Sequence, residues 1–107
     1  MPHIVLEHGG LDQPLPPLMQ ALAEAVAAHP AVPRDAVKVR AHRVDYLLLS
    51  GEPSFAHVTL RLMDTRGADQ HSELADAVMQ VLRRDLPETC ALCVETVAIP
   101  KASFRKR

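Results

Sequence analysis

Apolar and polar residues alternate with the two-residue period of a β-strand in two neighbouring stretches of the chain. Residues 37–49 begin with this alternation and end in a mostly apolar run, whereas residues 56–62 alternate throughout. We therefore expect a long strand followed by a second strand, paired as a hairpin through the turn 50–53. Apolar segments at 3–7 and 90–99 predict a first and a last strand.

Two other stretches carry apolar residues with the spacing of an amphipathic helix. The first begins at Leu15 behind a group of prolines, which suits the first turn of a helix, and Pro30 ends it. The second begins behind Asp69, the expected N-cap, and Pro87 ends it. The apolar positions of the two helices are Leu15, Leu18, Met19, Leu22 and Val26, and Leu74, Ala77, Val78, Val81 and Leu82.

The order of these elements is β-α-β-β-α-β, which predicts an α/β (α+β) domain with a four-stranded mixed sheet. Residues 1–107 are expected to form one domain made of two β-α-β half-repeats, about 2–49 and 55–99. Right-handed crossovers would place both helices on one face of the sheet. Several strands are apolar on both sides, so we expect other subunits to cover the open face and predict a homo-oligomer.

Composition and charge exclude several classes of function. The chain has 48% apolar residues, only 3% aromatic residues and a net charge of −1, so it has no overall field that attracts nucleic acid. Only the tail 104–107 is locally basic, and we interpret it as a solvated end. There is no membrane-length apolar run, and we expect a cytoplasmic protein with no nucleic-acid or membrane partner.

Metal-binding and cofactor-binding motifs are also absent from the sequence, so no cofactor or metal is predicted. Cys90 and Cys93 form a C-x-x-C pair, but the pair neither opens a helix nor has a second pair of ligands. We interpret both as ordinary buried cysteines of a reducing compartment. His3 and His57 occupy matching places in the half-repeats, and without a carboxylate to orient them they are interpreted as structural.

Pro2 and a small set of cations are the candidates for chemistry. Pro2 is either an incidental residue at the start of a strand or, after removal of Met1, a free secondary amine that can act as a base. Lys38 and Arg40 share one side of the second strand, and Arg66 lies in the turn between the third strand and the second helix. Together these cations could bind an anion beside the terminal amine.

Four segments resemble the 5-carboxymethyl-2-hydroxymuconate Δ-isomerases of the tautomerase superfamily. They are Pro-His-Ile-Val-Leu-Glu at 2–7, Val-Lys-Val-Arg-Ala-His-Arg-Val-Asp at 37–45, Phe-Ala-His-Val-Thr-Leu-Arg at 55–61, and Pro100 through Phe104. The resemblance implies a homotrimer and a cofactor-free mechanism in which Pro2 is the base.

The resemblance also implies roles for the cations. Arg66 matches an active-site arginine that contacts substrate oxygens, so Pro2 and Arg66 are the catalytic candidates. Lys38 stands where the family usually has the first arginine of an Arg-x-Arg pair, and Arg40 is the second member, so both are candidates for substrate binding.

The expected activity is a 1,3-allylic proton shift on an unsaturated hydroxy or keto dicarboxylic acid of the 5-carboxymethyl-2-hydroxymuconate type, a step in aromatic catabolism. Two alternatives stay open. The chain could be a tautomerase-superfamily enzyme for another small acid, or a trimeric module that binds an acid ligand without turning it over.

Overall fold

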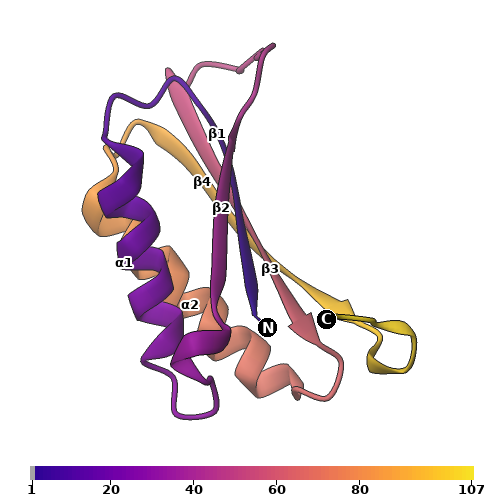
Figure 1. Cartoon of the computed structure of the whole chain (residues 1–107). Helices are drawn as coiled ribbons and strands as arrows, with labels where there is room; N and C mark the ends of the chain where they lie inside the picture. Colours follow the sequence, from indigo (N-terminus) through magenta and orange to yellow (C-terminus); the bar gives the residue numbers. More distant parts are fainter. Residues whose placement is uncertain (1) are drawn as a thin grey trace.

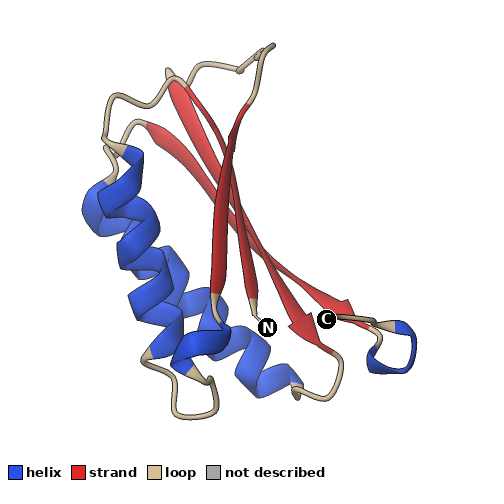
Figure 2. Ribbon diagram, in the orientation of Figure 1, coloured by secondary structure: helices blue, strands red, loops and turns tan. Residues whose placement is uncertain are grey.

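A four-stranded sheet forms one layer of the molecule, and two α-helices pack side by side on one of its faces (Figures 1 and 2). The computed structural model describes residues 2–107. The strands are β1 (His3–Gly9), β2 (Lys38–Arg43), β3 (Ser54–Met63) and β4 (Cys90–Ile99), the helices are α1 (Leu15–Ala27) and α2 (Ala68–Asp85), and short 3-10 helices are η1 (Arg34–Ala36) and η2 (Lys101–Ser103). The predicted β-α-β-β-α-β order and the placement of both helices on one face are confirmed.

The strand order is β2-β1-β3-β4, which corrects the predicted hairpin. The second and third strands are not neighbours, because β1 lies between them and pairs with β2 in parallel and with β3 antiparallel. β4 joins the far edge parallel to β3. Each β-α-β unit therefore contributes a parallel pair, and the two units meet at β1 and β3.

The predicted long second strand is also wrong, because β2 ends at Arg43 and residues 44–53 form a connection that crosses the end of β1 to reach β3 (Figure 1). Gly9 and Gly10 leave room for this crossing. A Cβ atom on Gly9 would lie 2.8 Å from Leu47 Cδ2, and one on Gly10 would lie 2.4 Å from the Pro53 carbonyl oxygen. Gly10 also has a φ of 73°, a conformation that a residue without a side chain adopts most easily.

The core lies between the helices and the even-numbered positions of β1 and β3. Ile4 and Leu6 of β1 and Val58, Leu60 and Leu62 of β3 are fully buried there. The apolar stripes of the helices face them, as the helical spacing predicted. The buried helix residues are Leu18, Leu22, Val26, Leu74, Val78, Val81 and Leu82.

The helix starts differ in part from the sequence prediction. α1 begins with prolines at its first positions, where their missing N–H groups have no intrahelical partner anyway. The N-cap of α2 is Gly67 rather than Asp69, which lies in the first turn. There its carboxylate still favours the positive end of the helix dipole. Neither α-helix of the described residues has the length and apolarity of a membrane span.

The other face of the sheet is covered by no element of the described chain (Figure 2). On this open face, the odd-numbered positions of β1 and the even-numbered positions of β2 are largely polar. Val97 and Ile99 of β4 also lie on this face, and they are apolar and half-buried. The apolar run Leu47–Leu49, which was expected on a strand with two buried faces, lies instead in the connection before β3. Tyr46 and Leu48 in that connection are 95% and 97% exposed.

Candidate active site at the start of the first strand

Pro2 is buried at the point where β1 begins. Its carbonyl oxygen accepts a hydrogen bond of 3.0 Å from the Lys38 backbone N–H, which starts the parallel pairing of β1 with β2. His3 pairs with Lys38 on one side and Arg61 on the other, so the register carries Pro2 to the end of the sheet where β3 finishes. The connection from α1 to β2, the turn from β3 to α2, and the C-terminal segment reach the same end (Figure 1).

A hollow of about 590 Å³ opens at this end, and His3 and Lys38 line it together with η1 and the tail. Its cationic side chains outnumber its carboxylates, which suits an anionic ligand. The complete lining is His3, Asp35, Ala36, Lys38, Phe104, Lys106 and Arg107. The presence of the tail in this lining was not predicted, because a short basic end carries no periodic pattern that places it.

Arg40 does not line the hollow itself but bonds to His3, which does. Its Nη1 donates a hydrogen bond of 2.9 Å to His3 Nδ1, which fixes that ring nitrogen as the acceptor. Burial lowers the pKa of His3, and the positive charges of Arg40, Arg61 and Lys38 lower it further. His3 is therefore held neutral, with its proton on Nε2.

Arg66 lies in the turn between β3 and α2, as predicted, but it does not line this hollow. Its Nη1 donates to the Ala31 carbonyl oxygen at 3.1 Å and to Gln70 Oε1 at 2.9 Å. Among the described residues, its Nε and Nη2 have no hydrogen-bond partner. One edge of the guanidinium is thus held by the protein, and the other edge is available for a carboxylate.

His57 has a carboxylate partner that the sequence did not indicate. Its Nε2 lies 2.7 Å from Glu95 Oε2 of β4, on the open face of the sheet. The expectation that this histidine lacks a carboxylate to orient it is therefore wrong. The reason is that β3 and β4 are parallel neighbours, a pairing that brings together residues far apart in sequence.

The prediction of two buried cysteines is confirmed for Cys90 and wrong for Cys93. Cys90 is buried, whereas Cys93 is exposed, because residues an odd number apart on a strand face opposite sides. Both are free thiols. Among residues 2–107, no group of histidines, cysteines and carboxylates could hold a metal ion.

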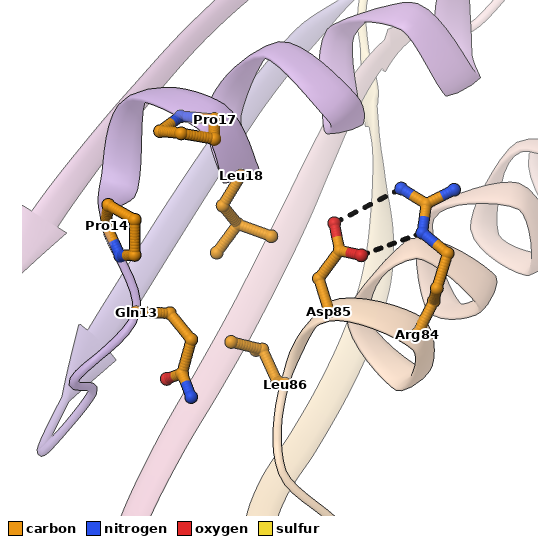
Figure 3. A pocket seen from close by; sticks show the side chains of 7 residues that line it. All are labelled: Gln13, Pro14, Pro17, Leu18, Arg84, Asp85 and Leu86. Atoms are coloured by element: carbon orange, nitrogen blue, oxygen red, sulfur yellow. Dashed lines mark hydrogen bonds and ion pairs between the residues drawn. The ribbon is translucent and has the colours of Figure 1, made fainter.

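A second hollow, of about 460 Å³, lies at the opposite end of the molecule, between the start of α1 and the end of α2 (Figure 3). Its cation, Arg84, donates two hydrogen bonds to the Asp85 carboxylate, from Nε to Oδ1 at 2.7 Å and from Nη2 to Oδ2 at 3.2 Å. The hydrogen bond from Arg84 lowers the pKa of Asp85, so the pair stays ionised and mutually neutralised. This hollow therefore lacks the excess of positive charge found beside Pro2.

The β-α-β-β-α-β order, with both helices on one face of a four-stranded mixed sheet, is the tautomerase fold. The solved structures that share the fold include the following three. A 5-carboxymethyl-2-hydroxymuconate isomerase from Deinococcus radiodurans R1 is 27% identical with a TM-score of 0.88, over 99% of this chain and 88% of that one. A 5-carboxymethyl-2-hydroxymuconate delta-isomerase is 18% identical with a TM-score of 0.85, over 100% and 88% of the two chains. A fused 4-OT asymmetric trimer is 18% identical with a TM-score of 0.75, over 95% and 91%.

The family follows from the sequence. The model of the 5-carboxymethyl-2-hydroxymuconate isomerase family matches residues 2–101, so the chain belongs to this family and is an isomerase. The resemblance seen in the four sequence segments is confirmed. A comparison with the sequences of curated proteins gives no match.

Proposed function

We propose that this isomerase catalyses a cofactor-independent 1,3-allylic proton shift on an unsaturated hydroxy or keto dicarboxylic acid of the 5-carboxymethyl-2-hydroxymuconate type. One observation carries the proposal: Pro2 lies buried at the end of the sheet where an adjacent hollow has an excess of positive charge. Membership of the isomerase family supports the reaction class. The cytoplasmic location expected from the sequence stays a prediction.

Pro2 would serve as the general base once Met1, which lies outside the described residues, has been removed. A terminal amine has a pKa near about 7.7–8.0 in water. Burial and nearby cations both disfavour its protonated form, so a neutral amine would be present near neutral pH. This amine would take a proton from the carbon α to the carbonyl, leaving a dienolate, and return it to the γ carbon as the double bond moves.

The cations would bind the substrate and stabilise the negative charge that develops on the enolate oxygen. Arg66 would use its unbonded Nε and Nη2 edge, which has the fork geometry that holds a carboxylate through two parallel hydrogen bonds. Lys38 would contact the substrate from the hollow, and Arg40 would act beside it. Lys38 is a point charge, so it would tolerate a wider range of carboxylate orientations than an arginine.

A homotrimer is part of the proposal. The sheet has an open face, and the connection 44–53 extends beyond the end of the sheet (Figure 1). Its side chains Tyr46 and Leu48 are exposed. Exposed apolar side chains such as Tyr46 and Leu48 commonly mark a contact between proteins. A self-associated form would cover both features and would exclude water from the end of the sheet.

The test combines the intact mass of the native protein with an ultraviolet assay of 2-hydroxymuconate ketonisation. Protein lacking Met1 should turn over the enol, and Pro2→Ala should lose at least about a hundredfold in kcat/KM, as expected when a positioned general base is removed. Absence of turnover by the processed protein would refute the proposed function. Undiminished turnover by Pro2→Ala would remove proline as the base.

A further inference from the structure

The C-terminal segment after β4 is folded back rather than extended. The Asp64 N–H donates to the Ile99 carbonyl oxygen at 2.9 Å, and Asp64 Oδ1 accepts from the Lys101 N–H at 3.2 Å. η2 then turns the chain, and Phe104 becomes half-buried. These contacts anchor the tail at its base and direct the residues beyond Phe104 to the hollow.

The tail adds two cations to the lining of the hollow, which Lys38 also lines. Lys106 and Arg107 line it together with Lys38, and Asp35 has the one acidic side chain of the lining. Among residues 2–107, none of the three cations has an ion-pair partner. Three unpaired positive charges around one hollow repel each other in the absence of an anion, so a bound carboxylate would relieve this repulsion.

The hollow also has the dimensions of a binding site for a small molecule. Its volume of about 590 Å³ lies within the range of roughly 300–1,000 Å³ that such sites occupy. Its wall contains the half-buried ring of Phe104 as well as the charged groups, so it offers an apolar surface for a carbon chain between polar ends.

We propose that Lys106 and Arg107 bind the carboxylate of a dicarboxylate substrate that lies farther from the reacting carbon, and so select dicarboxylates over monocarboxylates. The inference rests on the proposed function, since Pro2 and the first carboxylate set the reacting end of the substrate. The tail binds the other end of the substrate in the hollow that Lys38 also lines. Lys106 and Arg107 are thus specificity-determining residues, and neither takes part in proton transfer.

A matched pair of substrates tests this proposal. One is 2-hydroxymuconate, and the other is its monocarboxylate analogue, in which a methyl group replaces the distal carboxylate. In Lys106→Ala/Arg107→Ala, kcat/KM for the dicarboxylate should fall about tenfold or more, the size of effect expected from a lost charged hydrogen bond. The value for the monocarboxylate should stay within about twofold of wild type, because that substrate has no group for the tail to bind.

Two control variants separate local binding from general charge. Lys106→Arg/Arg107→Lys keeps both charges and should retain most of the preference for the dicarboxylate. Arg83→Ala removes one charge from an exposed position on α2, away from the hollow, and should leave the preference unchanged. An equal loss for both substrates, no loss for either, or a loss of preference in Arg83→Ala would each overturn the proposal.

Binding of unreactive muconate, measured by calorimetry, makes the test independent of turnover. Wild type should bind muconate about tenfold or more tightly than Lys106→Ala/Arg107→Ala, even in protein whose Pro2 has been replaced. Equal affinities would overturn the role of the tail. Turnover tests Pro2 as the base, whereas muconate affinity tests the tail. Failure of the proposed function would therefore appear as absent turnover, and failure of this inference would appear as equal muconate affinities.

Discussion

At the scale of single residues, the site depends on how each polar group is already bonded. Arg66 is held through Nη1, so its free edge keeps one direction. His3 is held through Nδ1 by Arg40, and its neutral ring adds a donor without adding a charge. In both cases a neighbour uses one part of the side chain and leaves another part available for a ligand.

His8 gives a prediction about pH and stability. It is buried on the helix side of β1, and burial, with the nearby charge of Arg43, lowers its pKa. In the unfolded chain, histidine titrates near about 6.5, so below that pH the unfolded state binds more protons than the folded state. The free energy of unfolding should therefore decrease as pH falls below about 6.5, and this contribution should level off below the folded pKa.

Urea midpoints measured across pH 5 to 8 at one protein concentration check this prediction. His3, whose pKa is also lowered, contributes in the same direction. His8→Gln cannot titrate and should show a shallower decline than wild type, with the two compared relative to their own values at pH 8. Identical declines would contradict the role given to His8.

At the scale of elements, the turn between α1 and β2 contacts both α2 and the Arg66 side chain. His29 Nδ1 accepts the Ala31 N–H at 3.1 Å, and His29 Nε2 lies 2.9 Å from Glu73 Oε2 on α2. The carbonyl oxygen of the same Ala31 accepts from Arg66. The His29 ring therefore fixes the residue whose backbone holds the arginine in place.

We expect His29→Ala to lower kcat/KM about tenfold by releasing Ala31 and, with it, Arg66. His29→Asn should recover most of the activity, because an asparagine oxygen can accept the same N–H two residues ahead. The readout is a double-mutant cycle with Arg66→Ala, in which the two losses should not add. Additive losses would show that the turn does not act through Arg66, and Asp76→Ala, an exposed change on α2, serves as the control.

The elements themselves were predictable to different degrees. The strand 90–99 and the helix starting at Leu15 agree with the structure, because the period of each apolar pattern matches a buried face. The pairing of β2 with β3 was wrong, because neighbours in sequence favour a hairpin and nothing local shows that β1 lies between them. The apolar run ending at Leu49 was predicted as part of a strand because its residues are apolar. In the structure it lies in the connection 44–53, and Leu47 and Leu48 are exposed, which no local pattern indicates.

The candidate site shows the same division. Alternation along one strand placed Lys38 and Arg40 on a common side, and a turn placed Arg66, as the structure has them. The contributions of Lys106 and Arg107 depend on how the chain folds back after β4, which no local pattern encodes. Residues within regular elements could thus be predicted, whereas residues brought in by a tail could not. The division into one domain with two half-repeats stays a prediction.

At the scale of the whole molecule, the open sheet face and the connection 44–53 lead to the last prediction. Tyr46 and Leu48 are almost fully exposed and contribute nothing to the core of one chain, so Tyr46→Ser/Leu48→Ser should leave that core intact. If these side chains contact another subunit, the double variant should lose the trimer, and light scattering should show a folded monomer at micromolar concentration.

Ala28→Ser, an exposed change at the end of α1, is the control and should stay trimeric. A monomeric wild type would refute the trimer, whereas a variant that stays trimeric would place the contacts on the sheet face. Because the candidate site lies at one end of that sheet, loss of the trimer should also lower turnover of 2-hydroxymuconate, and full activity in a monomer would show that one chain suffices for the reaction.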